Sequence, residues 1–425
     1  PSSPPMSASP PSSPPSGAAF VPPYAYAASY QYWCSLCPNL SVNGNCFGNI
    51  SKDKKERSSA GKSETSNSTS SSSNESGPFD SKQGEAYREA LKNEGHFEVK
   101  REAFERFNLS DDILGRLAEG IKSLSNAGWP PHVIGIYDEF WQVLEEVSKI
   151  HKSMRSAIPS GDFAGFYVGP QSKKARDAEG YPPHRDKTSY DPSTFFEDGL
   201  PKISTTWVAL TDATPDTSCL YVVPADKDPY YKTNEPWKAL FDQPARFQDI
   251  RALPAPAGTV LTFSHRLLHW GSRARPKAPH PRIAISFTFQ DPSIPSAYST
   301  FKASLPSPSL PLRLLLISTQ WMNYYSQPPI NKPIGDARAD LMLGFFLAGY
   351  QNMKPEYMKA TLGSVACQAA IMKRQVHTIQ TKRVARRKQA LERANAAAEK
   401  LVEAEEKETK TSQECSNGVV DADSE

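Results

Sequence analysis

The stretch "RIAISFTF", residues 282–289, alternates strictly between two kinds of side chain. Large apolar residues occupy every second position, and the positions between them hold Arg282 followed only by small residues. A period of two is the pattern of a β-strand, because successive side chains point to opposite faces of a sheet. We therefore predict a strand with one packed apolar face and a second face that begins with an arginine.

Runs with the same period precede this stretch: "FAGFYVG" at 163–169, "ISTTWVALTDA" at 203–213, "SCLYVVP" at 218–224 and "GTVLTFS" at 258–264. Pro, Gly and Asp residues separate these runs, without a helical pattern between them. Several short strands connected in this way favour an antiparallel barrel or sandwich over a doubly wound parallel sheet. The predicted fold class is therefore mainly β.

Helical patterns flank the strands. Apolar residues recur with the period of an α-helix in "NLSDDILGRLAEGIKSLSNAG" at 108–128 and in "HVIGIYDEFWQVLEEVSKIHKSM" at 132–154. The first pattern begins at a capping residue, Ser110 or Asp111, and ends at Gly128. We expect both helices to cover the core, and the chain turns helical again after residue 311.

The composition divides the chain into three parts. Pro/Ser-rich runs such as "PSSPPMSASPPSSPPSG" have too little apolar periodicity to bury a core. We predict a disordered region at 1–105, the β-rich domain at 106–330, and a helical C-terminal extension with a disordered end at 331–425. Because the sequence opens on Pro1 rather than Met, we expect further residues upstream of it.

Charge and cysteine content limit the partners and the location. The 49 basic and 46 acidic residues give a net charge of +3, so we expect no nucleic-acid partner. No apolar run approaches the ~20 residues that span a membrane. The six cysteines are too scattered for a disulfide framework, which favours a reducing, cytoplasmic location. Cys34, Cys37 and Cys46 could supply ligands of a zinc knuckle, or they could be exposed thiols of an unfolded segment.

The C-terminal extension segregates its charges. Basic residues concentrate between 373 and 388, and acidic residues between 399 and 407. Its alanine-rich composition and ion pairs one turn apart favour a helix. Such a helix is either a solvated tail or an antiparallel coiled coil that joins two copies of the chain. The tail is favoured, because the apolar seam of a coiled coil is not sustained.

A candidate metal site lies in "YPPHRDKTSY", residues 181–190. His184 and Asp186 are two residues apart, so they point to the same side of an extended segment. An imidazole and a carboxylate suit an ion such as ferrous iron, and a third ligand would leave positions open for substrates. The later strand "TVLTFSHRLLHWGS" offers His265 and His269, of which His269 is favoured because a Gly-Ser turn follows shortly after it.

Arg282 is a candidate anion-binding residue. It shares its strand face with Ala284 and Ser286, which leave room beside the guanidinium. Inside a barrel this arginine would form a bidentate pair with a carboxylate of a dicarboxylic acid. The alternative is an arginine exposed at the edge of the sheet.

Four blocks resemble the phytanoyl-CoA dioxygenase family in the same order: "HRD" at 184–186, "WVALTDATPDTSCLYVVPADK" at 207–227, "GTVLTFSHRLLHWGS" at 258–272 and "RIAISF" at 282–287. The resemblance covers roughly residues 160–290. It implies a double-stranded β-helix of the jelly-roll or cupin type that uses Fe(II), with 2-oxoglutarate as cosubstrate. It also implies that the iron ligands are His184, Asp186 and His269, and that Arg282 and Ser272 bind 2-oxoglutarate.

The chain departs from the family pattern at three places. Ser218 replaces a glycine, Ala225-Asp226-Lys227 replaces a Gly-Ser-His sequence, and "PKAPHP" lengthens the segment between His269 and Arg282. The insertion makes Arg275 a second candidate for the arginine.

The resemblance implies a dioxygenase that hydroxylates a small-molecule or lipid-like substrate, using 2-oxoglutarate and dioxygen. Asp186 favours hydroxylation, since a small residue in its place would leave room for a halide. The alternatives are a catalytically silent β-helix that binds a ligand or partner, and a metal-dependent hydrolase or isomerase. No general base for the last of these is evident beyond the metal ligands. Lys173, Lys174 and Arg176 either contact an anionic substrate or belong to a solvated loop.

Overall fold

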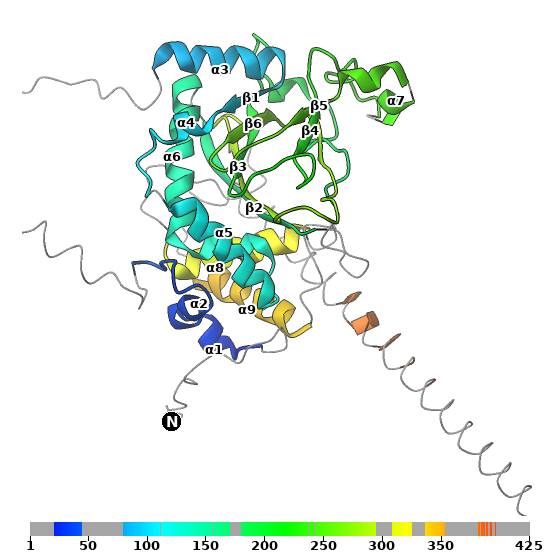
Figure 1. Cartoon of the computed structure of the whole chain (residues 1–425). Helices are drawn as coiled ribbons and strands as arrows, with labels where there is room; N and C mark the ends of the chain where they lie inside the picture. The colour runs from blue at the N-terminus through cyan, green and yellow to red at the C-terminus, as the bar shows by residue number, and fades with distance from the viewer. Residues whose placement is uncertain are drawn as a thin grey trace, which may run out of the picture. The chain divides into compact units, whose positions relative to one another are not determined.

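The computed structural model describes residues 21–44, 80–110, 112–155, 157–170, 180–236, 238–242, 244–294, 308–324 and 336–352, and some residues between 381 and 396. The chain divides into two units, Pro1–Gln368 and Ala369–Glu425. All strands of the described residues lie in the first unit (Figure 1). Within the described residues, no helix is both long and apolar enough to cross a bilayer.

Two antiparallel sheets form the centre of the first unit. The larger has the order β1-β6-β3-β8-β2, where β1 is His96–Val99, β6 Val260–Ser264, β3 Ile203–Ala209, β8 Arg282–Gln290 and β2 Ile158–Val168. The smaller has the order β5-β4-β7, where β5 is Arg251–Leu253, β4 Leu220–Val223 and β7 Leu268–Gly271. The predicted antiparallel arrangement is confirmed, and each of the five alternating runs contains a strand.

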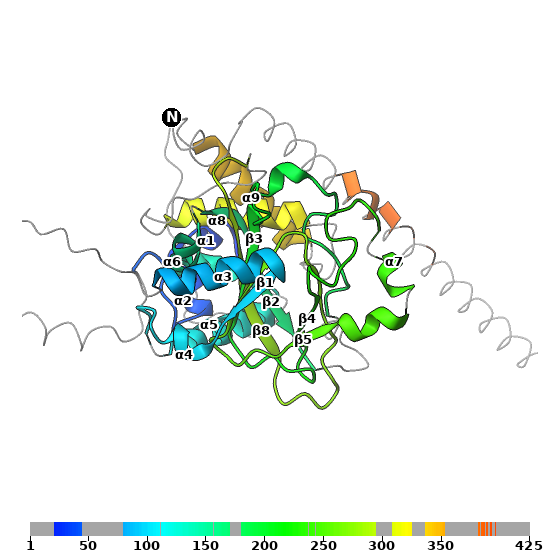
Figure 2. The same ribbon diagram turned by 90° about the horizontal axis from the view of Figure 1, so that it is seen from above.

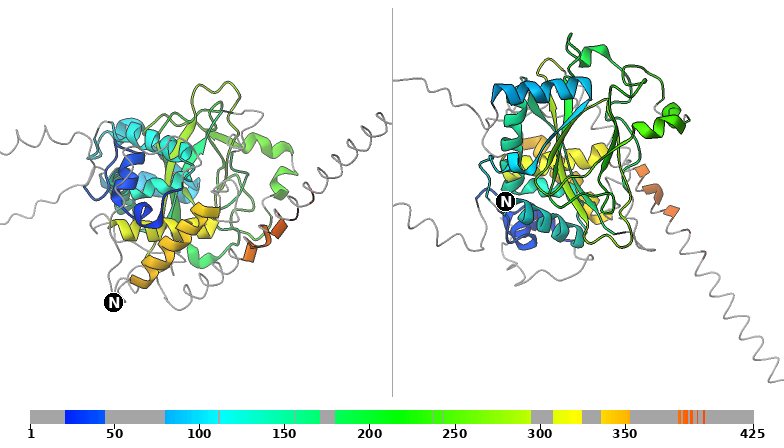
Figure 3. Two further views of the ribbon diagram at one scale, coloured as in Figure 1. Left: turned by 90° about the horizontal axis from the view of Figure 1, so that it is seen from below. Right: turned by 45° about the horizontal axis from the view of Figure 1, so that its top comes forward.

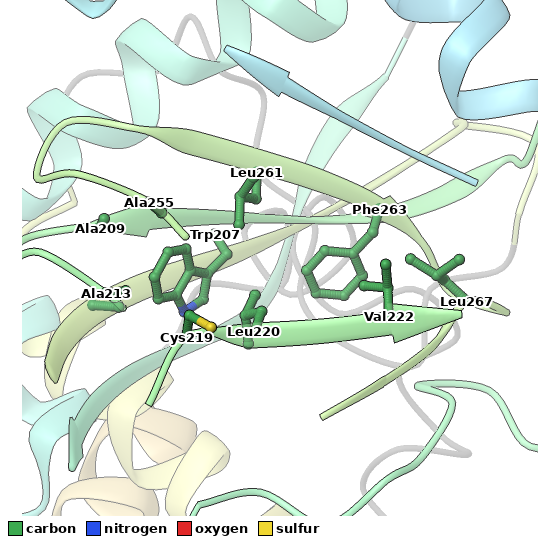
Figure 4. Packing of buried hydrophobic residues seen from close by; sticks show 11 residues of the cluster. Trp207, Ala209, Ala213, Cys219, Leu220, Val222, Ala255, Leu261, Phe263 and Leu267 are labelled. Carbon is green, nitrogen blue, oxygen red and sulfur yellow. The ribbon is translucent and has the colours of Figure 1, made fainter. Parts of the chain in front are cut away.

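Apolar side chains of both sheets pack together between them. Trp207 and Leu261 of the larger sheet belong to the same buried cluster as Leu220 and Val222 of the smaller (Figure 4). Ala284 of β8 is part of this cluster as well. The small residues of the 282–289 stretch therefore face the space between the sheets.

The apolar face of β8 packs against helices on the opposite side. Phe140 of α6 (Asp138–Met154) contacts Phe287, with ring centroids 4.8 Å apart, and His151 of α6 stacks on Phe289 at 3.7 Å. The helices α3 (Ser81–Asn93), α5 (Ile113–Asn126) and α8 (Leu310–Tyr324) lie on this helical side too (Figures 1 and 3).

The two predicted core-covering helices are thus confirmed, with shifted starts. α5 begins at Ile113 after Asp112, whose side chain makes no capping hydrogen bond. α6 begins at Asp138, because the 3-10 helix η1 (Pro131–Ile136) precedes it. The remaining short helices are α4 (Arg101–Phe104), η3 (Pro192–Thr194), α7 (Lys238–Phe241) and η4 (Pro244–Asp249). Of these, α7 lies on the side of the strands away from α5 and α6 (Figure 2).

The prediction of disorder over 1–105 is wrong for the part that the structure describes. α1 (Tyr24–Ala27) and α2 (Tyr30–Leu36) precede α3 and β1 in this region. Trp33 of α2 is fully buried, and its backbone carbonyl accepts a hydrogen bond from the Tyr137 hydroxyl at 2.9 Å. Aromatic residues of this region, such as Trp33, provide the buried apolar surface that stabilises these helices, although the overall composition is rich in proline.

The two described cysteines of this region are not exposed thiols. Cys34 and Cys37 are both buried, and the Cys37 thiol contacts the Gly120 carbonyl of α5 at 3.6 Å. Cys46, the third suggested ligand of a zinc knuckle, lies outside the described residues. The two described cysteines therefore help to pack α2 against α5.

α8 and α9 (Asp336–Asn352) belong to the first unit, which differs from the predicted boundary at residue 330. Arg313 of α8 is fully buried, and it donates to the Ile136 carbonyl and to Asp138, each at 2.5 Å. Arg338 of α9 donates to the Ala127 carbonyl at 2.7 Å. Arg313, which interrupts the apolar sequence of α8, therefore helps to pack this helix. It also provides a hydrogen-bond donor for the backbone carbonyl at the end of η1.

Most of the charge-segregated extension lies outside the described residues, and those described between 381 and 396 are helical. The structure therefore gives no support for a coiled coil or for self-association through this segment. Residues 171–179, which include the basic residues near the metal motif, are likewise outside the described part.

A chain that ends at residue 368 is expected to keep the urea midpoint of the full chain, because the described core lies before that residue. A chain that ends at residue 307 loses α8 and α9, including the buried side chains of Leu315, Ile317 and Trp321. Each of these contributes ~1.5–3 kcal/mol of burial, so this second truncation should lower the unfolding free energy by several kcal/mol. Equal midpoints for the two truncations would contradict this assignment.

Candidate metal centre

Three potential metal ligands meet at the end of the smaller sheet. The segment after Pro183 pairs with β7, since His184 and His269 exchange two backbone hydrogen bonds of 3.0 Å. His184, Asp186 and His269 each offer one ligand atom, and these atoms all lie within 4.8 Å of one another. Asp186 Oδ1 is 3.7 Å from His184 Nε2 and 3.6 Å from His269 Nε2. The arrangement is that of a three-ligand site with one open side.

Backbone carbonyls orient both imidazole rings. His184 Nδ1 lies 2.8 Å from the Pro182 carbonyl, and His269 Nδ1 lies 3.0 Å from the Leu267 carbonyl. A carbonyl can only accept, so each Nδ1 carries the hydrogen and each Nε2 keeps its lone pair. Both Nε2 atoms therefore face Asp186 in the tautomer that binds a metal ion.

Thr205 of β3 orients the carboxylate. Its hydroxyl donates to Asp186 Oδ2 at 2.6 Å, which leaves Oδ1 facing the two histidines. Thr205 lies on the larger sheet, so this hydrogen bond connects the metal-ligand segment across the space between the sheets. The sequence did not predict this partner, because nothing in the pattern of β3 distinguishes one threonine from its neighbours.

Burial keeps the inner histidine neutral. His269 is almost fully buried, and burial together with the neighbouring His184 lowers the pKa of His269 to about 4. A neutral imidazole is the form that coordinates a metal. At neutral pH His269 is therefore already in the form that a metal ligand needs, with no proton to release.

A buried ion pair lies beneath the metal-ligand segment. Arg185 points away from its two neighbours and pairs with Asp228 at 2.7 Å, and both side chains are at most 2 % exposed. It also donates to the Arg266 carbonyl at 2.8 Å. Arg266 in turn donates to the carbonyls of Lys187 and Thr233 at 2.8 Å each. This network holds the backbone that directly follows the His-x-Asp motif.

Arg282 is buried, and none of the described residues is an acidic partner for it. It is 1 % exposed, and its Nε has no hydrogen-bond partner in the described part of the chain. Its guanidinium lies 6.0 Å from the Phe166 ring and 5.9 Å from the Trp207 ring. Burial lowers the pKa of Arg282 to about 10, so the side chain remains a cation at neutral pH. A buried cation without a counter-ion is costly and indicates a site for an anion.

The other candidate arginine has a different environment. The Arg275 side chain is 71 % exposed and pairs with Asp216 at 3.0 Å on the surface. The geometry therefore favours Arg282 as the anion-binding residue, despite the inserted "PKAPHP".

Buried hydroxyls lie beside Arg282. Tyr181 Oη and Ser272 Oγ are both buried; Tyr181 Oη lacks a hydrogen-bond partner among the described residues, while Ser272 lies beside the hydroxyl of Tyr221. Ser218, which has a positive φ of 80°, hydrogen-bonds through its side chain to the Ser272 carbonyl. A serine in this strained conformation is therefore held by a specific contact at the site.

His265, the second histidine candidate, lies outside the three-ligand cluster. Its Nε2 is 2.9 Å from the Thr194 hydroxyl, and its Nδ1 is 3.0 Å from the Ile203 carbonyl. Both ring nitrogens are thus engaged by protein groups. Burial lowers the pKa of His265 to about 4, which is consistent with a structural, neutral side chain.

Thr205→Val is expected to weaken metal binding while leaving the fold intact, because valine keeps the shape but loses the hydrogen bond to Asp186. Loss of a group that orients a ligand typically costs ~10–100-fold in metal affinity. Titration of the protein with Mn(II) measures the effect, and Thr205→Ser, which keeps a hydroxyl, is the control that should restore it. Equal affinities in the wild type and Thr205→Val would show that Asp186 needs no such support.

Comparison with known proteins gives a family match within the first unit. Residues 136–282 match the model of the phytanoyl-CoA dioxygenase (PhyH) family. This confirms the resemblance predicted from the four sequence blocks, and the matched range includes the His-x-Asp motif, both sheets' central strands and Arg282. No curated protein matches the chain.

Three solved structures illustrate the structural similarities. The epimerase SnoN in complex with Fe3+, alpha ketoglutarate and nogalamycin RO is 17 % identical, with 53 % of this chain and 89 % of that chain covered and a TM-score of 0.39. The carbocyclase SnoK from nogalamycin biosynthesis is 19 % identical, with 51 % and 87 % covered and a TM-score of 0.36. EctD from S. alaskensis with 2-oxoglutarate and 5-hydroxyectoine is 15 % identical, with 56 % and 84 % covered and a TM-score of 0.35.

Proposed function

Because residues 136–282 match the phytanoyl-CoA dioxygenase family, whose members use Fe(II) and 2-oxoglutarate, we propose that this protein is a non-haem Fe(II)- and 2-oxoglutarate-dependent oxygenase. The observation that carries the proposal is the combination of two features in one space between the sheets. One is the cluster of His184, Asp186 and His269, and the other is the buried guanidinium of Arg282, which has no acidic partner among the described residues and whose Nε has no acceptor there. In this reading the two sheets are the two halves of a double-stranded β-helix.

The donor set fits ferrous iron. Two imidazole nitrogens and one carboxylate oxygen on one face are the ligands of non-haem iron oxygenases, and they leave positions for a chelating cosubstrate and dioxygen. His184 and His269 would supply Nε2, and Asp186 would supply Oδ1. When bound, iron and 2-oxoglutarate supply an oxidant for a C–H bond at the expense of decarboxylation to succinate.

The chain's own residues would bind and orient the cosubstrate. Arg282 offers two parallel N–H donors to the far carboxylate of 2-oxoglutarate, a charge-assisted pair that a buried site strengthens. Phe166 and Trp207 lie beside the guanidinium and limit the access of water to it. The buried Ser272 hydroxyl, which lies beside the Tyr221 hydroxyl, would be a further donor.

We further propose that the reaction is hydroxylation of a small-molecule or lipid-like substrate. A carboxylate at position 186 completes the ligand set and leaves no extra position for a halide. The alternative of a catalytically silent binding protein has no support in the ligand geometry, since all three ligand atoms face one another.

The test uses the full chain, purified without metal and then loaded with Fe(II) under nitrogen. We expect one iron per chain, and formation of succinate when 2-oxoglutarate and oxygen are added together with an untargeted mixture of metabolites. Product analysis of that mixture identifies the hydroxylated compound. If the protein binds iron but forms no succinate with any of the metabolite mixtures, the catalytically silent alternative is favoured.

His269→Ala is expected to lose the iron, and His265→Ala is expected to keep it. The first substitution removes a group whose Nε2 faces Asp186, while the second removes a ring already engaged by Thr194 and Ile203. Metal content after gel filtration distinguishes the two, without any need for activity. Loss of iron from His265→Ala, with a wild-type unfolding curve, would reverse the assignment of the third ligand.

A further inference from the structure

The phenol of Tyr181 is a polar group that neither the fold nor the metal cluster accounts for. Its Oη is buried and has no hydrogen-bond partner among the described residues. An unsatisfied buried hydroxyl costs ~1–3 kcal/mol, so a group of this kind is retained only where something compensates for it. A phenol carries its hydrogen at neutral pH, so this hydroxyl can act as a donor.

The position of Tyr181 is fixed by its backbone. Its carbonyl accepts a hydrogen bond of 3.1 Å from the amide of Gly271, at the end of β7. Gly180, directly before it, approaches the carbonyls of Gly271 and Ser272 too closely for any side chain. The segment therefore presents the Tyr181 ring from a rigid support rather than from a free loop.

Tyr181 has neighbours both at the metal cluster and beside the arginine. Its ring centroid is 5.4 Å from that of His184 and 5.9 Å from that of Phe166. Phe166 also lies against the Arg282 guanidinium. The Tyr181 ring is thus a neighbour of one candidate metal ligand and of an aromatic ring that lies against Arg282.

Two buried donors without acceptors among the described residues belong to this site, Tyr181 Oη and Arg282 Nε. The backbone joins their neighbourhoods at Gly271, because a side-chain carbon placed on it would be 3.2 Å from Arg282 Nη1 and 3.5 Å from the Tyr181 backbone nitrogen. A guanidinium and a phenol hydroxyl with unused hydrogens match a carboxylate, which accepts about four hydrogen bonds and carries the missing negative charge.

We propose that the Tyr181 hydroxyl donates a hydrogen bond to the far carboxylate of 2-oxoglutarate, alongside Arg282. Tyr181 is then a cosubstrate-binding residue of this chain, and its ring forms the wall between the metal and the carboxylate. This inference rests on the proposed function, because it requires that 2-oxoglutarate bind at the metal.

The test is the affinity of the full-length protein, loaded with Mn(II), for 2-oxoglutarate, measured by calorimetry. A hydrogen bond to a charged group contributes ~1.5–3 kcal/mol, so Tyr181→Phe should raise the dissociation constant by about tenfold or more. The matched control is Tyr137→Phe, which removes another buried phenol, one that donates to the Trp33 carbonyl. The control should lose stability and leave the 2-oxoglutarate affinity unchanged.

A second experiment, on the anaerobic Fe(II) protein, tests whether Tyr181 contacts the far carboxylate of 2-oxoglutarate or its chelating end. Chelation of 2-oxoglutarate by Fe(II) gives a charge-transfer absorption band, whose energy depends on hydrogen bonds to the chelating atoms. With saturating 2-oxoglutarate, Tyr181→Phe should show the wild-type band, since its missing hydrogen bond lies at the far end. A shifted band would overturn the assignment to the far carboxylate.

The outcomes separate this inference from the function on which it rests. If the wild type binds 2-oxoglutarate and Tyr181→Phe binds it equally tightly, the inference is wrong and the proposed function stands. If the wild type binds metal but no 2-oxoglutarate, both the proposed function and the inference fail.

Discussion

Asp186→Ala is expected to abolish succinate formation and to leave the protein folded. The substitution removes the only carboxylate of the three-ligand cluster, while the side chain itself is one-third exposed and contributes little packing. Loss of a direct ligand should exceed the ~10–100-fold loss of metal affinity that a supporting residue causes. The measurements are iron content, succinate formation and the urea midpoint.

The matched control is Asp191→Ala, a nearby exposed carboxylate that bonds to Ser193 rather than to the histidines. It should keep both iron and turnover. Wild-type succinate formation by Asp186→Ala would refute the assignment of the metal ligands. Loss of the urea transition would instead show that Asp186 is needed for folding.

Arg282→Ala is expected to raise the 2-oxoglutarate concentration required for half-maximal turnover by about tenfold or more, because a charge-assisted pair with a carboxylate contributes ~1.5–3 kcal/mol. Removing Arg282 leaves no buried acid unpaired among the described residues, since none of them neutralises it. The fold should therefore tolerate the change. Arg282→Met, which retains more of the side-chain volume between Phe166 and Trp207, should give the same result.

Arg275→Ala is the control for this experiment, because its exposed pair with Asp216 is worth little. It should leave the 2-oxoglutarate requirement at the wild-type value. If Arg275→Ala shows the large effect and Arg282→Ala the small one, the inserted "PKAPHP" has exchanged the roles of the two arginines.

The sequence predicted those strands whose two faces carry different kinds of side chain. The stretch 282–289 alternates because one face meets the aromatic side chains of α6 and the other meets the space between the sheets. β1 and β5 were not predicted as strands, and β7 was not separated from the longer run that also contains β6, because such short segments show no clear period of their own. Their pairing depends on partners far along the chain, such as β6 for β1.

The candidate metal ligands could be identified from the sequence, but the residues that orient them through hydrogen bonds and ion pairs could not. His184 and Asp186 are two apart, so an extended segment brings them together by itself. Thr205 reaches Asp186 only because β3 crosses the site, and Asp228 reaches Arg185 only through the loop after β4. No local pattern encodes such contacts, because they are products of the tertiary fold.

The N-terminal helices were missed for a related reason. Proline and serine dominate the composition before residue 105, while the residues that bury α2 are few and closely spaced. Tyr32 and Trp33 find their partners on segments about a hundred residues away, as in the 2.7 Å hydrogen bond from Trp129 Nε1 to the Tyr32 hydroxyl. A prediction from local periodicity has no access to such partners.

The contact between α1 and α9 has a consequence for biosynthesis. The Tyr24 ring lies 5.6 Å from the Phe345 ring, and its hydroxyl lies 3.4 Å from the carbonyl of Gly344, 320 residues later in the chain. During translation at ~5–20 residues per second, α1 waits on the order of a minute or less for this partner to leave the ribosome. For that interval its aromatic residues are exposed to chaperones and to other nascent chains. Any stop codon before α9 would make that exposure permanent, so truncated products of this chain should be recognised and degraded.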